Sequence, residues 1–173
     1  MPTKLDLEFF SRQMVSHAEA IDRLARGVSD EQACWKPDSC SWSILEVINH
    51  LCDEEREDFR ARLDIMLHNN DTPFPEIDPE SRVAARGYNE RALAKSLDDF
   101  ASERRASIRW LADLRDPNWD AIHEQPNWRG TAADMFASWV AHDILHMRQL
   151  VRLRWRYTME KLDPHKTDYA GSW

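Results

Sequence analysis

Apolar residues recur at steps of three and four in four separate stretches of this 173-residue chain, and no other feature limits its fold as strongly. Such spacing places apolar side chains on one face of an α-helix. No segment keeps a period of two for long, so we predict helices and no β-strands. The first helical stripe consists of Leu7, Phe10, Met14, Ala18, Ile21, Leu24 and Val28.

The other three stretches predict helices over residues 43–68, 89–114 and 131–156. Ser43 and Glu46 match a capping box at the start of the second helix, and Thr131 and Asp134 form a similar pattern at the start of the fourth. Long connections with proline and glycine follow the second and third helices. We therefore expect an all-α four-helix bundle that forms a single domain over residues 1–173, with 156–173 as a C-terminal tail.

Charge and cysteine content exclude several classes of protein. The net charge of −8 leaves no basic surface for nucleic-acid phosphates. No apolar stretch is long enough to span a membrane, and the first residues carry acids where a signal peptide needs an apolar run. The three cysteines are an odd set without a C-x-x-C motif, which favours the reducing cytoplasm. We expect a small-molecule substrate as partner, and a second copy of the chain as a further candidate, because two-fold dimers are the commonest oligomers.

Three histidines form a candidate metal site. His142 and His146 lie four residues apart on the apolar face of the fourth helix, so both imidazoles can reach one ion. His50 lies near the apolar stripe of the second helix, and a third imidazole from a facing helix would complete a three-ligand site with an open position. The alternative is that these are hydrogen-bonded core histidines, since a chain with seven histidines contains such a pair fairly often by chance.

Two segments carry a resemblance to a known family. Residues 42–54 (WSILEVINHLCDE) resemble the second-helix signature of the DinB-like superfamily, and residues 131–149, with Trp139, His142, Asp143, His146 and Gln149, resemble its fourth-helix signature. The resemblance implies a four-helix bundle in which His50, His142 and His146 hold one divalent ion, zinc or nickel. It also implies the transfer of a low-molecular-weight bacterial thiol, such as bacillithiol or mycothiol, to an electrophilic small molecule.

Two acidic residues are candidates for supporting roles. Glu54 lies one helical turn beyond His50, where it would act as an extra ligand, an acceptor for an imidazole N–H, or a base. Alternatively, Glu54 is a solvated charge on the helix surface, as we expect for most of the acidic run 53–58. Asp143 points about 100° away from His142 around the helix, so it would orient His50 or fix a neighbouring helix. We expect Cys52 to be a packing residue and assign surface or local roles to His17, His68, His123 and His165.

The leading hypothesis is a metal-dependent thiol transferase, with the thiol as co-substrate. A non-catalytic alternative is a binding or dimerisation module of a stress response, in which the metal only stabilises the bundle. A third hypothesis is hydrolysis by metal-bound water, which requires Glu54 or Asp143 within hydrogen-bond reach of that water.

Overall fold

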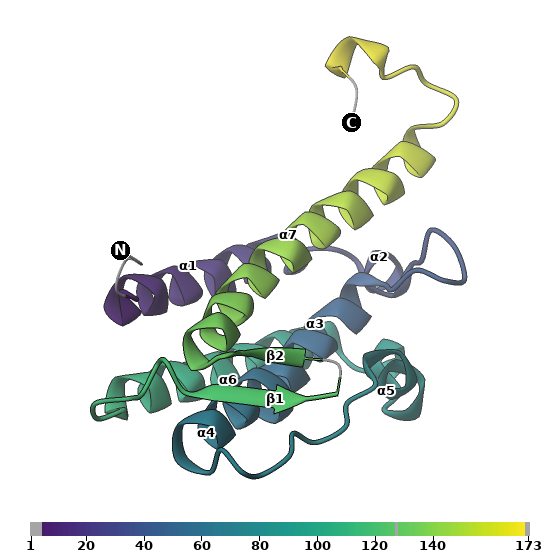
Figure 1. The fold of residues 1–173 in the computed structure, drawn as a ribbon. Helices are drawn as coiled ribbons and strands as arrows, with labels where there is room; N and C mark the ends of the chain where they lie inside the picture. The colour runs from purple at the N-terminus through teal and green to yellow at the C-terminus, as the bar shows by residue number, and fades with distance from the viewer. Residues whose placement is uncertain (1–4, 127, 172–173) are drawn as a thin grey trace.

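The computed structural model describes residues 5–126 and 128–171, and it confirms the four-helix bundle (Figure 1). The second of the four rods is continuous but has three parts, two α-helices joined by a π-helix. The rods are α1 (Leu7–Ala25), α3–η1–α4 (Ile44–Asp53, Glu54–Phe59 and Arg60–His68), α6 (Leu93–Asp113) and α7 (Ala132–Leu162). Within the described ranges, no helix combines the length and apolarity needed to cross a bilayer.

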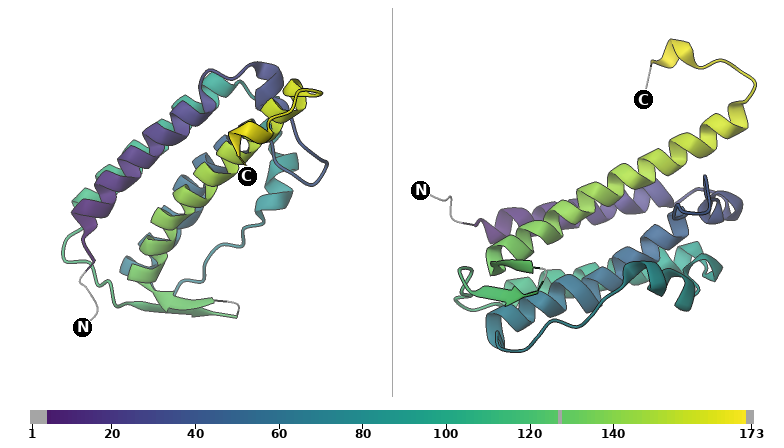
Figure 2. Two further views of the ribbon diagram at one scale, coloured as in Figure 1. Left: turned by 90° about the horizontal axis from the view of Figure 1, so that it is seen from above. Right: turned by 45° about the vertical axis from the view of Figure 1, so that its right-hand side comes forward.

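The rods pack so that α1 and α3 are diagonal to each other. Helix α1 contacts α6 and α7, and α3 contacts the same two helices from the other side. Helices α1 and α7 run in one direction, whereas the α3–α4 rod and α6 run in the other (Figures 1 and 2). The connection after α4 therefore runs back along the bundle before α6 begins, which explains its length (Figure 2).

The apolar stripes meet in two buried clusters. One contains Ile21, Val47, Leu97, Phe100 and Leu150, and Cys52 packs there as predicted. Burying each side chain of this size contributes about 1.5–3 kcal/mol, so the stripes supply the main driving force for the bundle. The second cluster lies nearer the start of α7 and contains Met14, Leu63, Met66, Phe74, Leu111, Ala132, Met135, Phe136 and Trp139.

Both predicted caps are present. The Ser43 hydroxyl accepts a hydrogen bond from the Glu46 amide at 3.1 Å, and the Glu46 carboxylate accepts one from the Ser43 amide at 2.8 Å. Thr131 and Asp134 make the same pair of bonds at 3.1 and 2.8 Å. Each cap satisfies amides that the first helical turn leaves unpaired, and so fixes where α3 and α7 begin.

The prediction of no strands was wrong. Residues Ile122–Gln125 (β1) and Trp128–Thr131 (β2) form an antiparallel hairpin with Ile122 opposite Thr131. Four residues per strand are too few for an alternating pattern to stand out in the sequence. The hairpin closes one end of the bundle, where Trp128 packs against the second apolar cluster. Gly130 is required here, because a Cβ at this position would lie 2.7 Å from the Trp128 indole.

Several helix boundaries differ from the predicted ones. The long connection contains α5 (Pro79–Ala85) and a 3-10 turn, η2 (Tyr88–Glu90), so the third rod begins at Leu93 instead of Asn89. Helix α7 continues to Leu162, because no breaking residue occurs before Pro164, and it takes up part of the predicted tail. Shorter helices are α2 (Asp30–Cys34) and η3 (Asp168–Ala170).

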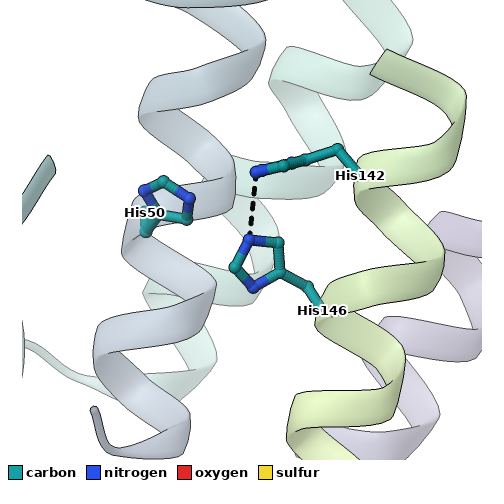
Figure 3. A group of neighbouring side chains, drawn as sticks. All are labelled: His50, His142 and His146. Atoms are coloured by element: carbon teal, nitrogen blue, oxygen red, sulfur yellow. Dashed lines mark hydrogen bonds between the residues drawn. The ribbon is translucent and has the colours of Figure 1, made fainter. Parts of the chain in front are cut away.

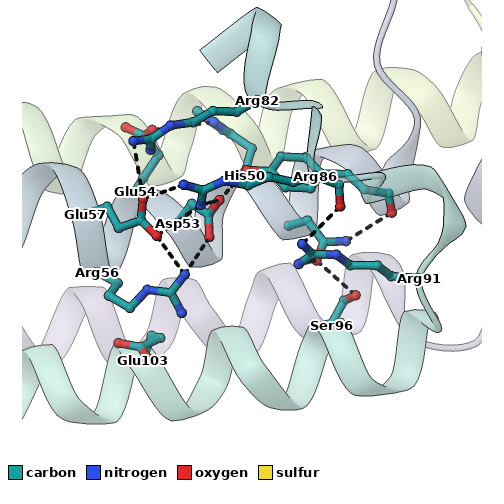
Figure 4. A network of polar contacts seen from close by, with 12 residues as sticks. His50, Asp53, Glu54, Arg56, Glu57, Arg82, Arg86, Arg91, Ser96 and Glu103 are labelled. Atoms are coloured by element: carbon teal, nitrogen blue, oxygen red, sulfur yellow. Dashed lines mark hydrogen bonds and ion pairs between the residues drawn. The ribbon is translucent and has the colours of Figure 1, made fainter. Parts of the chain in front are cut away.

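The π-helix η1 explains why the acidic run was misjudged. A π-turn holds one residue more than an α-turn, so it rotates the following side chains relative to the preceding helix. Four acids that were expected mainly at the solvated face are buried here, namely Asp53, Glu54, Glu55 and Asp58. Buried carboxylates need partners, and arginines supply most of them. Arg86 pairs with both Asp53 and Glu57 (Figure 4).

Candidate metal centre

The structure brings the three predicted histidines together. His50 projects from α3 toward α7, which carries His142 and His146 one turn apart (Figure 3). One ring nitrogen of each residue lies within 4.8 Å of the other two. The ring centre of His50 is 5.4 Å from that of His142 and 4.9 Å from that of His146. Three nitrogen donors from two helices thus converge on one small volume.

The spacing of the two α7 imidazoles fits a shared ion. Their Nε2 atoms lie 3.0 Å apart, and two nitrogens on one tetrahedral zinc ion lie about 3.3 Å apart, given Zn–N bonds of about 2.05 Å. A cation therefore needs only a slight widening of this gap. Without an ion, the same distance suits an N–H of one ring donating to the lone pair of the other.

Gln149 sets the tautomer of His146. Its side-chain carbonyl oxygen lies 2.8 Å from Nδ1 of His146. An amide oxygen only accepts, so Nδ1 carries the proton and the Nε2 lone pair points toward His142. Hydrogen bonds of this kind orient histidine ligands in metal proteins. The fourth-helix resemblance already included Gln149, but the sequence alone gave no reason for its position.

The surroundings keep the three imidazoles neutral. Burial, followed by the neighbouring His146 and His142, lowers the pKa of His50 to about 2. Burial and His146 lower the pKa of His142 to about 3, and burial lowers that of His146 as well. Neutral rings have the free lone pairs that a metal ion requires, so the site is prepared for a cation without first losing protons.

Aromatic rings hold two of the imidazoles in place. Trp42 contacts His50 edge-on, with the ring centres 4.8 Å apart. The ring centre of Phe59 lies 5.0 Å from that of His142. Phe59 also stacks on Trp139, with an interplanar angle of 5°. In the sequence Phe59 is one of the apolar positions of the second predicted helix, and its spacing indicates no contact with His142. Its position beside His142 depends on η1, which no periodicity in the sequence indicates.

Glu54 lies beside the histidines, and the interpretation of it as a solvated charge is wrong. Its side chain is 8% exposed, and its Oε1 lies 3.6 Å from Nδ1 of His50, too far for a hydrogen bond. Burial, followed by the charge and hydrogen bond of Asp58, raises the pKa of Glu54 to about 8. This carboxyl group therefore holds a proton near neutral pH and can release it with a modest change of surroundings.

Asp143 faces away from His50 and joins three helices. Its carboxylate accepts hydrogen bonds from Arg104 of α6 at 2.7 and 2.8 Å, and it lies 3.2 Å from Nδ1 of His17 in α1. Burial opposes its ionisation, but the bonds to His17 and Arg104 outweigh burial and lower the pKa of Asp143. These contacts agree with the helix-fixing role. His17, for which we predicted a surface or local role, has a side chain that is only 13% exposed and has Asp143 as its partner.

Arg104 is the residue that sequence reasoning missed altogether. It is buried and also donates to the carboxylate of Glu55 at 2.7 Å and to the carbonyl of Met14 at 2.6 Å. The Trp139 indole donates to the same Glu55 oxygen at 2.7 Å. The network binds η1, α6 and α7 together directly behind the histidines. His123, for which the same two alternatives were predicted, is buried in the hairpin and stacked on Phe74.

Two cavities open beside the histidines. One, of 410 Å³, lies between α7 and the segment 37–42 and reaches His146 and Trp42. The other, of 1160 Å³, lies along α7 and is lined by both His142 and His146. The imidazoles of α7 are therefore accessible to a small molecule on two sides, whereas His50 is buried behind them.

Comparisons with known proteins agree with this architecture. The family model of the DinB superfamily matches residues 13–150. YuaE, an uncharacterised protein of Bacillus subtilis, is 23% identical over 144 residues, which cover 75% of this chain and 87% of YuaE. The solved structure of YfiT from Bacillus subtilis superposes with a TM-score of 0.80 at 14% identity and covers 91% of both chains. YfiT is described as a probable metal-dependent hydrolase with an unusual four-helix bundle topology.

Proposed function

This chain belongs to the DinB superfamily, and from that premise we propose that it is a metal-dependent enzyme that transfers a low-molecular-weight thiol to an electrophilic small molecule. In this proposal His50, His142 and His146 hold one divalent ion. Zinc and nickel both suit three imidazole ligands. The reaction is placed in the cytoplasm, where a reducing environment keeps the thiol available.

The observation that carries the proposal is the convergence of three neutral imidazoles next to an open cavity. Three uncharged ligands would leave the ion its full charge, with which it would stabilise a thiolate at neutral pH. A closed, purely structural site would have no need of the cavities that reach His142 and His146. This arrangement therefore favours a reacting centre over a metal that only stabilises the bundle.

The protein's own groups have separate tasks in the transfer. The histidines and Gln149 fix the position of the reacting sulfur, and the cavity walls orient the electrophile. The thiol S–H gives its proton to solvent water, the sulfur forms a bond to the electrophilic carbon, and the leaving group departs with the electron pair of the bond that breaks. Glu54, whose carboxyl group has a pKa raised to about 8, is suited to hold a proton at the edge of the site.

A second candidate is metal-dependent hydrolysis, which the same carboxyl group favours. A hydrolase needs a group that takes a proton from the attacking water. Glu54 lies one turn from His50, and its ionised form, the minority at neutral pH with a pKa of about 8, is the form that accepts such a proton. The description of YfiT supports this candidate as well. It differs from the first in its co-substrate, because water replaces the thiol.

Metal analysis of the purified chain tests the shared premise. We expect about one zinc or nickel ion per chain by mass spectrometry, and H142A should lose it while keeping its helical circular dichroism. H68A is the matched control, because His68 is exposed and lies against Asp64 at 2.9 Å. Full occupancy in H142A would overturn the assignment.

The two candidate reactions are then separated with the metal-loaded protein. Monobromobimane is offered with a panel of low-molecular-weight thiols, and the rate of adduct formation is compared with that of H142A. Ester and amide substrates are offered without thiol in parallel. Thiol-dependent turnover supports the first candidate, and turnover in water alone supports the second.

A further inference from the structure

A trough lined by arginines runs along α7 away from the histidines. The two cavities beside the candidate metal centre share His146, Gln149, Arg152 and Arg156 in their linings, and the larger one also includes His142. We call the larger one the α7 trough. A small molecule bound there against His142 or His146 lies beside these arginines.

The trough is the basic part of an acidic protein. Residues 144–159 contain four arginines and no aspartate or glutamate, although the chain as a whole has a net charge of −8. Arg148, Arg152 and Arg156 line the trough, whereas Arg154 turns to the other side and donates to the carbonyl of Leu24 at 3.0 Å. A local cluster of one sign next to a cavity attracts ligands of the opposite sign.

Two of these arginines have no acidic partner. Among the residues that the structure describes, no carboxylate pairs with Arg148 or Arg152. Arg156 differs, because Asp38 lies 3.8 Å from it. Asp38 and Glu80 border only the smaller cavity, and the described lining of the larger one includes no acid. The positive charge of Arg148 and Arg152 is therefore available on the side of the larger cavity.

The helix geometry directs this charge toward the histidines. Arg152 lies six residues after His146, about 9 Å further along the helix axis. Side chains in an α-helix lean toward its N-terminus, which shortens the separation along the axis between the Arg152 guanidinium and His146. Leu145 and Trp155 line the same cavity and are 52% and 39% exposed, which adds apolar surface to its lining.

We propose that Arg148 and Arg152 bind the carboxylate of an anionic small molecule whose other end reaches the histidine centre. The inference rests on the proposed function and adds to it the chemical class of the ligand. A guanidinium fork matches a carboxylate with two parallel hydrogen bonds, which makes arginine the usual residue for this recognition. The carboxylate belongs either to the thiol or to its reaction partner, and the experiment separates these two sources.

The test uses the full chain loaded with Co²⁺, whose absorption spectrum reports ligands that bind the ion. One arm compares 3-mercaptopropionate with 2-mercaptoethanol, and the other compares 4-carboxybenzohydroxamate with benzohydroxamate. We expect the carboxylated ligand of at least one pair to bind about tenfold tighter, as one charged hydrogen-bonded contact provides. R152Q should remove most of that preference. R109Q, which removes the same charge from an exposed position of α6, should keep it.

Different outcomes test the anion site and the metal centre separately. A preference in the thiol pair alone places the carboxylate on the thiol, and one in the hydroxamate pair alone places it on the reaction partner. If cobalt binds and all ligands bind R152Q and the wild type with the same preference, the anion site is wrong and the metal centre stands. A chain that takes up no cobalt overturns both.

Discussion

The carboxylate of Asp143 and the guanidinium of Arg104 form a buried fork, with two hydrogen bonds of 2.7 and 2.8 Å, directly beside His142 in the sequence. Because Arg104 belongs to α6, this pair ties α7 to the opposite corner of the bundle. It fixes the rotation of α7 at the turn that carries His142. The orientation of that imidazole thus depends on a contact on the other side of its helix.

Removing the Asp143 carboxylate should destabilise the whole bundle. D143A leaves the Arg104 charge buried with only Glu55 to balance it, so we expect a loss of about 3–5 kcal/mol in the free energy of unfolding. Urea unfolding followed by circular dichroism measures this loss. D99A is the control, because it removes only an exposed pair with Lys95, worth less than about 1 kcal/mol. Equal effects of the two variants would contradict the structural role of the fork.

Gln149 should control metal affinity through His146. Q149L removes the acceptor that fixes the tautomer, and we expect the dissociation constant for zinc to rise about 10- to 100-fold. Competition with a chromophoric chelator measures it. Q149E keeps an oxygen acceptor and should retain most of the affinity. An unchanged dissociation constant in Q149L would show that the hydrogen bond does not orient the ligand.

Glu57 should stabilise the fold in a pH-dependent way. Hydrogen bonds from Arg86 and then Arg56 outweigh partial burial and lower its pKa from 4.5 to about 2. The stabilisation is therefore complete above about pH 4.5 and disappears as the pH falls toward 2. We expect wild type to exceed E57Q by at most about 1 kcal/mol at pH 6, after allowing for solvent screening. The difference should vanish near pH 2, whereas E76Q, at an exposed site, should match wild type throughout.

The cap of α3 should contribute measurably to stability. S43A removes the hydroxyl that accepts from the Glu46 amide, and the expected loss is about 1 kcal/mol in the free energy of unfolding. S102A, in the exposed middle of α6, should change stability little, because alanine is the better helix former there. Thermal unfolding of both variants checks this, and a loss in S102A as large as that in S43A would argue against a specific cap.

The features predicted correctly have local signals. The caps, the four stripes and the i, i+4 spacing of His142 and His146 all occur within a few residues of sequence. The convergence of His50 on them followed from placing it near an apolar face that had to meet α7. Its role as a metal ligand remains a prediction, and metal analysis of H142A tests the centre.

The features that were missed depend on distant partners. The burial of Arg104 has no local signal, because its partners Glu55 and Asp143 lie 49 and 39 residues away. The partial burial of His17 does have a local signal, because it follows Met14 by three residues on the inner face of α1. The π-helix has no periodic signature of its own, so the contact of Phe59 with His142 was not visible in the sequence, whereas the place of Glu54 one turn beyond His50 was.

The π-helix also lets this rod hold one residue more than an unbroken α-helix would. If residues 54–59 formed ordinary α-helix at the same chain length, one half of the rod would swing by about 100° against the other. Either His50 would then leave α7, or Leu63 and Met66 would leave their apolar neighbours. Loss of one residue between Glu54 and Phe59 would remove the extra residue itself, so an ordinary α-helix in the shorter chain would keep both halves in place.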